Sequence, residues 1–316
     1  MAEDMIFSVH DAVVSNLDRL AGEYSTLSEQ RLLELYDVAD AMAQTSVQLL
    51  DDGLDAYEML SVLSESLTFG EYPISDDASE DNVHLVAKEL DSLSRSDRTL
   101  FTELYNGRLT SLGRALTERD FLPSLSGDES FTYVRNSLSD EAYDVFSQDF
   151  DDPKIKYSPS LKECARAVTA GEATYCLLPL EERGGVRLHT VSEIIFRNDF
   201  KINSVIPVFG QDGNADMKYA LVSRGFTVPD RAEDDDVYLE IRLGSDSSLS
   251  EVFTAVDYFG MSIYRVNTLT FDTEGETETY FSVVIKDGSD GLVPLLSYFS
   301  LFLRDFVPVG IYKNLE

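Results

Sequence analysis

The last eighty residues, 237–316, carry the clearest pattern of apolar and polar positions in the chain. Val237 to Leu243 alternates between apolar and polar residues, which predicts a strand. A turn follows, and Ser248 with Glu251 three residues later predicts a capping box at the start of a helix over 248–259. Beyond it the pattern predicts strands at 261–271 and 279–286, a helix at 292–303 and a strand at 307–313.

The predicted order of strand, helix, strand, strand, helix, strand is that of a ferredoxin-like split βαβ sandwich, in which two helices cover one face of an antiparallel sheet. With a turn and a helix start where a small ligand could bind, this segment resembles an ACT domain, an amino-acid-sensing module. The resemblance implies a homodimer, because ACT domains commonly pair side by side. It also implies an aromatic amino acid bound at the free N–H groups of the turn, at Ser245, Asp246, Ser247, Ser248 and Leu249.

The turn departs from the pattern of phenylalanine-responsive ACT domains. Those domains carry "GALxxxL" here, and only Leu249 plainly matches that pattern. Asp246 is a candidate partner for an amino group. A simple capped turn without a ligand stays open as the alternative.

Residues 1–125 are predicted to form a helical domain. Apolar stripes recur at helical spacing and are typical of packing faces. The expected helices span 6–23, 28–50, 55–67, 82–94 and 97–117. An all-helical chorismate mutase domain is an alternative, but its arginines and lysine surround a dicarboxylate, and the basic residues here do not match that spacing.

From residue 130 the pattern changes to alternating strands and helices, which predicts a mostly parallel sheet and an α/β lobe over 126–228. The expected strands are 131–134, 154–157, 174–178, 202–208 and 218–223, and the expected helices are 139–146, 160–169 and 190–196.

The run from Ser160 to Glu181 resembles the segment of prephenate dehydratases in which "aV..Geadyg" leads into "lPIEN". Ser137-Leu-Ser-Asp-Glu-Ala142 is similar to that family's "sySeeAa". The resemblance covers about 130–316 and implies a periplasmic-binding-like α/β lobe followed by an ACT domain at 236–316. The family has two lobes, but here 202–206 passes within a dozen residues to 217–222, which looks like the return strand. We therefore expect a truncated, single lobe.

The residues that carry the family's chemistry are changed. The threonine of its "TRF" motif is associated with protonation of the leaving hydroxyl, and Met217 stands at that position. A pocket reshaped for another small molecule would use Ser137, Ser139, Glu181, Arg183 and Thr190. The alternative for Glu181 to Arg183 is a charged turn between a buried strand and a helix.

These changes favour a non-catalytic prephenate-dehydratase-like protein whose ACT domain serves regulation, amino-acid sensing or dimerisation in aromatic amino-acid (phenylalanine) metabolism. One alternative is an active dehydratase, a carbon–oxygen lyase that converts prephenate to phenylpyruvate, water and CO2. The other is an interaction scaffold.

Composition narrows the partners. A net charge of −33 would repel nucleic acid and anionic lipid. Cys164 and Cys176 are expected to be core residues, and with three scattered histidines we expect no metal site and no cofactor. The chain has no run of eighteen apolar residues and no basic leader, which predicts a cytoplasmic protein without a membrane span.

Overall fold

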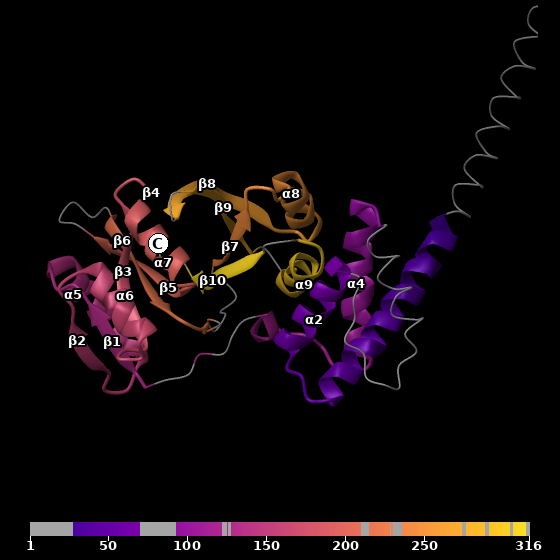
Figure 1. Cartoon of the computed structure of the whole chain (residues 1–316), viewed down its shortest axis with the longest axis horizontal. Coiled ribbons are helices and arrows are strands. Elements are labelled where there is room, and N and C mark those ends of the chain that lie inside the picture. The colour runs from indigo at the N-terminus through magenta and orange to yellow at the C-terminus, as the bar shows by residue number, and fades with distance from the viewer. Residues whose placement is uncertain are drawn as a thin grey trace, which may run out of the picture. The chain divides into compact units, whose positions relative to one another are not determined.

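The computed structural model describes residues 28–69, 93–121, 125, 128–209, 215–227, 229, 236–273, 276–287, 291–303 and 306–313. The chain divides into two compact units (Figure 1). One comprises Met1–Leu54 and Glu65–Ala115, and the other Asp55–Ser64 and Leu116–Glu316. The helix predicted over 6–23, most of the helix predicted over 82–94 and the loop at 210–214 lie outside the described residues.

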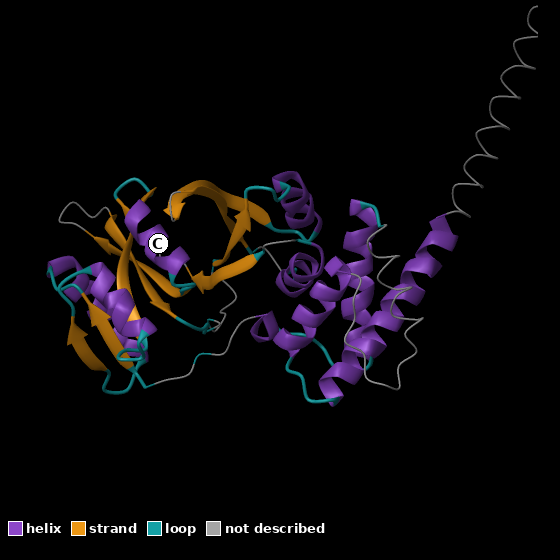
Figure 2. Ribbon diagram, in the orientation of Figure 1, coloured by secondary structure: helices purple, strands orange, loops and turns teal. Residues whose placement is uncertain are grey.

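Within the amino-terminal part, the described residues are mostly helical, as their pattern predicts (Figure 2). Residues 28–51 form one helix, followed by α2 (Ala56–Phe69), α4 (Arg95–Ser111) and the short η1 (Glu118–Phe121). In the first unit, the hydroxyls of Tyr105 and Ser46 are buried and hydrogen bonded at 2.8 Å. Several arginines pair with carboxylates of the same unit, in the pairs Arg31–Asp97, Arg108–Asp40 and Arg114–Asp51.

A single ten-stranded sheet runs through the second unit. Its order is β2-β1-β3-β6-β5-β10-β7-β9-β8, and β4 pairs with β3 beside this path. The strands are β1 (Ser130–Tyr133), β2 (Lys154–Tyr157), β3 (Tyr175–Glu182), β4 (Val186–Arg187), β5 (Lys201–Phe209), β6 (Ala215–Ser223), β7 (Val237–Gly244), β8 (Ser262–Thr273), β9 (Glu276–Lys286) and β10 (Val307–Lys313).

The first half of the sheet carries helices on both faces. Strands β2, β1 and β3 are parallel, whereas β6 is antiparallel to β3 and β5. Helix α5 (Ser137–Phe146) contributes to one apolar cluster, and α6 (Leu161–Thr169) and α7 (His189–Arg197) contribute to another. The mixed α/β character that the sequence predicts is therefore observed.

Strand β3 is longer than predicted. It was expected to end at Leu178 but continues to Glu182, because its last residues pair with β6 on one side and with the two-residue β4 on the other. The interpretation of Glu181 and Glu182 as part of a turn is wrong, since both are strand residues. The turn follows them, and Gly184 and Gly185 have positive φ angles of 87° and 78° there.

The second half of the sheet follows the predicted chain order. Strand β7 leads into α8 (Leu249–Tyr258), then β8 and β9, then α9 (Leu292–Phe302) and finally β10. The spatial order β10-β7-β9-β8 is antiparallel throughout. The predicted capping box of α8 is wrong, because the Ser248 side chain makes no capping hydrogen bond. The Glu251 carboxylate instead accepts a hydrogen bond from the Tyr298 hydroxyl of α9 at 3.0 Å.

One residue pair joins the two halves of the sheet. Strand β10 is parallel to β5, and the pair is Gly310 with Ile202. A Cβ atom on Gly310 would lie 2.5 Å from the carbonyl oxygen of Ile202, so only glycine allows this approach. Lys201 supports the junction, since its Nζ donates to the Pro308 carbonyl at 3.0 Å and pairs with Asp199 at 2.9 Å.

Candidate functional site

A buried ion pair connects β4 to the second half of the sheet. Arg187 and Glu240 lie 2.8 Å apart, and their side chains are 7% and 2% exposed. A second contact, from Nη1 of Arg187 to Oε2 of Glu240 at 3.0 Å, makes the pairing bidentate. This geometry gives the strongest charge-assisted hydrogen bonds between these side chains.

Two hydroxyls complete the surroundings of Glu240. Ser282 of β9 donates to Oε1 at 3.0 Å, and Tyr312 of β10 donates to Oε2 at 2.9 Å. Burial, reinforced by the nearby Glu240 carboxylate, raises the pKa of the Tyr312 phenol well above its usual value. Burial alone would lower the pKa of Arg187, but Glu240 outweighs it and the pKa is raised. Residues of four strands, β4, β7, β9 and β10, thus meet at this pair.

A second ion pair lies beside the first. Glu181, at the end of β3, is buried and pairs with Arg265 of β8. Arg265 also approaches the carbonyl of Gly185 in the turn before β4, at 3.4 Å. Glu181 stands opposite Arg187 in the register of β3 and β4. Of the predicted pocket residues, Glu181 is thus held by a guanidinium from the second half of the sheet.

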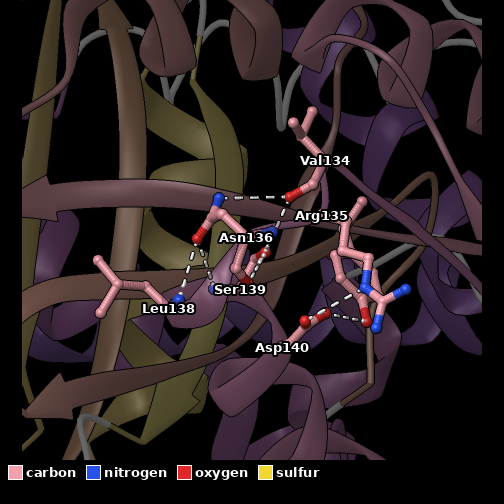
Figure 3. A network of polar contacts seen from close by, with 7 residues as sticks. Val134, Arg135, Asn136, Leu138, Ser139 and Asp140 are labelled. Carbon is pink, nitrogen blue, oxygen red and sulfur yellow. Dashed lines mark hydrogen bonds and ion pairs between the residues drawn. The ribbon is translucent and has the colours of Figure 1, made fainter.

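Ser137 and Ser139 lie in the first turn of α5, and Figure 3 shows the contacts of Ser139. Ser137 is exposed, whereas Ser139 is 2% exposed. The hydroxyl of Ser139 donates to the Val134 carbonyl at 2.8 Å and accepts from the N–H of Asn136 at 2.9 Å. The amide oxygen of Asn136 in turn accepts from the N–H groups of Leu138 and Ser139, both at 3.0 Å. Ser139 thus serves the start of its own helix as half of a capping box.

The other predicted pocket residues lie on separate elements. Arg183 is exposed and faces Asp216 at 3.7 Å. Thr190 is exposed and lines a groove of about 510 Å³ between α6 and α7. Met217 lies on β6, opposite Glu182, and packs against the apolar cluster that contains Phe131 and Tyr219.

The residues predicted at the ACT-like turn follow β7. Ser245 and Asp246 are exposed, and Ser247, Ser248 and Leu249 are half-buried. The N–H of Ser247 donates to the Gly244 carbonyl at 3.1 Å, which closes the turn. The hydroxyls of Ser248 and Ser250 lie 3.0 Å apart.

The described part of the chain holds no group of three histidine, cysteine or acidic side chains placed to bind a metal ion. It also contains no helix with the length and apolarity needed to cross a membrane. Cys164 and Cys176 are buried and free.

Sequence analysis did not single out Arg187, Glu240 or Arg265. Glu240 and Arg242 occupy the polar positions of an alternating strand, which predicts exposure to solvent. The burial of Glu240 arises because its strand face is covered by parts of the chain distant in sequence. An arginine or glutamate at such a position carries no local signal of burial.

Comparison with known proteins gives weak likenesses. No family model matches the chain, and no curated protein matches it. A prephenate dehydratase from Streptococcus mutans is similar with a TM-score of 0.48 and 14% identity, over 60% of this chain and 100% of that one. GqqA, described as a quorum quenching acylase, has a TM-score of 0.44 and 18% identity, over 59% of this chain and 96% of its own.

A prephenate dehydratase from Arthrobacter aurescens in complex with L-Phe also has a TM-score of 0.44, with 13% identity, over 58% of this chain and 89% of that one. Likenesses of this size do not bear on the function of the chain.

Proposed function

We propose that the protein is a non-catalytic relative of prephenate dehydratase. We further propose that residues 236–316 form an ACT domain that binds an aromatic amino acid at the turn before α8. The non-catalytic assignment depends on the side chain at position 217, which is that of Met217. The sequence resemblance puts a proton donor at this position, and a thioether packed against an apolar cluster has no proton to give. Strand order β10-β7-β9-β8 and the βαββαβ chain order support the second part.

The environments of the alternative hydroxyls support the same proposal. Ser139 is committed to the capping of α5, and Thr190 lies on an exposed face of α7. The only carboxylate among the predicted pocket residues, Glu181, is neutralised by Arg265.

The catalytic part is tested by incubating the purified chain at high concentration with prephenate and measuring phenylpyruvate. We expect no product above the rate without protein. Turnover that scales with protein concentration would contradict the non-catalytic assignment.

The binding part is tested by thermal denaturation with L-phenylalanine, L-tyrosine and L-tryptophan. A ligand at one hundred times its dissociation constant should stabilise the fold by about 2.7 kcal/mol. Asp246→Asn should abolish that response without changing the unliganded midpoint, because Asp246 is exposed. Asp257→Asn, exposed on α8, is the matched control. Equal responses of both variants would remove the turn as the site.

A further inference from the structure

Three buried side-chain atoms of the second unit have no hydrogen-bond partner among the described residues: Nε of Arg187, Oγ of Ser192 and Nδ2 of Asn267. They belong to β4, α7 and β8, respectively. Each can donate a hydrogen bond. A buried donor without an acceptor destabilises a fold, and most native buried polar groups are paired. If these three donors lie together, one bound group could accept hydrogen bonds from all of them.

The strand register places Asn267 beside the buried ion pair. Asn267 stands opposite Ser282, and cross-strand partners point to the same face of a sheet. Ser282 donates to Glu240, and Glu240 holds Arg187. Asn267 is thus linked to the Arg187 guanidinium through two residues of the same sheet face, Ser282 and Glu240.

Helix periodicity places Ser192 over the same face. His189, Ser192 and Phe196 follow the spacing that aligns residues on one side of a helix. His189 is hydrogen bonded through Nε2 to the carbonyl of Thr270 in β8 at 2.9 Å. The Phe196 ring lies 4.4 Å from the Tyr280 ring of β9. Ser192, between two residues that contact β8 and β9, faces these strands as well.

The charges on this face favour an anion. Glu240 and Arg242 are two residues apart on β7 and therefore share a face, and the guanidinium of Arg242 lies over Phe196 at 4.5 Å. Among the described residues, the carboxylate that acts electrostatically on Arg242 is that of Asp199, which also pairs with Lys201. The guanidinium groups of Arg187, Arg242 and Arg265 and the ammonium group of Lys201 thus lie with three carboxylates, those of Glu181, Glu240 and Asp199. In a chain of net charge −33, this is a local positive excess.

We propose that Arg187, Ser192 and Asn267 bind a small molecule with a single carboxylate, between α7 and the face formed by β7, β8 and β9. Glu240 takes the two Nη groups of Arg187, which leaves Nε–H to donate to a ligand oxygen. The Asn267 amide and the Ser192 hydroxyl supply the other donors. Three aromatic rings also belong to α7 and these strands. The Phe196 ring lies 4.8 Å from that of Phe271 and 4.4 Å from that of Tyr280, and these rings suit an apolar part of the ligand. This site differs from the turn before α8 and does not depend on the function proposed for that turn.

Calorimetric titration of the full chain tests this site with acetate, phenylacetate and, as a probe without a carboxylate, phenethylamine. We expect both carboxylates to bind, phenylacetate more tightly, and phenethylamine not to bind. Asn267→Leu removes one donor and should weaken phenylacetate binding at least tenfold. The control is Thr268→Val, the next residue of β8, whose side chain is exposed on the other face and whose exchange should leave binding unchanged.

A second variant guards against misfolding of the first. Ser192→Ala keeps the helix intact and should also weaken phenylacetate binding. The proposal would be overturned if the unaltered chain did not bind phenylacetate, or if both variants bound it as tightly as the unaltered chain. Buried water molecules would then be the partners of the three donors. Asp246→Asn separates the two sites, because it should not affect phenylacetate. If Asp246→Asn alone abolished binding, the carboxylate would belong to the turn and this inference would fail.

Discussion

The buried carboxylate of Glu240 is stabilised by side chains from other strands. The carboxylate is 2% exposed and accepts hydrogen bonds from Arg187, Ser282 and Tyr312, which come from three other strands. The removal of an ion from water is costly, and the cost is recovered only where the geometry is good and further hydrogen bonds are present. Loss of one partner is therefore expected to affect the stability of the whole unit.

We expect Glu240→Gln to destabilise the fold by about 3–5 kcal/mol, because it leaves the Arg187 charge buried and uncompensated. Urea denaturation of the purified variant gives the free energy of unfolding. Glu182→Gln, which changes an exposed carboxylate at the end of β3, is the control and should change that value by less than about 0.5 kcal/mol. Similar midpoints for the two variants would mean that the ion pair contributes little.

Individual residues were the hardest part to predict from sequence. The resemblance of its segment to a dehydratase motif predicts Ser139 in a ligand pocket, whereas its hydroxyl takes part in the capping box of α5. Ser248 and Glu251 have capping-box spacing, but Glu251 found a better donor in Tyr298 of α9. The Glu251 contact joins residues that are distant in sequence and leaves no local trace, whereas the contacts of Ser139 are all within its own helix start.

At the scale of elements, the alternating pattern was a good guide. Strands β2 and β10 have the predicted bounds, Lys154–Tyr157 and Val307–Lys313. Strand β4 is two residues long and exists only by pairing with β3, so no periodicity could reveal it. The parallel pairing of β5 with β10 was equally hidden, because it rests on one residue pair between strands separated by about a hundred positions.

This pairing gives the second stability prediction. Gly310→Ala should destabilise the fold by about 1–3 kcal/mol, the usual cost of a methyl group forced into a filled space. Its Cβ would meet the backbone of Ile202, which cannot move aside as a side chain can. Gly107→Ala is the control, since nothing lies within 4 Å of its Cβ inside helix α4. Alanine there should stabilise by about 0.5–1 kcal/mol. Equal effects in thermal or urea denaturation would contradict the close approach.

At the scale of the whole molecule, charge dominates. The net charge of −33 is spread over a chain whose ion pairs are mostly exposed at the surface. Exposed pairs contribute little to stability, and a large net charge opposes a compact state through repulsion. Composition predicted this much directly. It could not predict that one sheet would span the α/β part and the βαββαβ part.

Salt should therefore stabilise the protein. Added NaCl shortens the screening length to about 10 Å at 0.1 M, so repulsion between carboxylates should weaken and the midpoint of thermal unfolding should rise. Tetramethylammonium chloride at equal ionic strength is the control for specific sodium binding and should give the same rise. A midpoint that falls with either salt would show that the exposed ion pairs outweigh the repulsion.

The position of β10 has a consequence for biosynthesis. This strand lies between β5 and β7 in space but follows every other strand in the chain. As the polypeptide leaves the ribosome, all other strands of both halves of the sheet are made before the strand that joins them. Strands β5 and β7 must each wait with an open edge until β10 emerges, and during that interval a chaperone or a neighbouring nascent chain could occupy the gap.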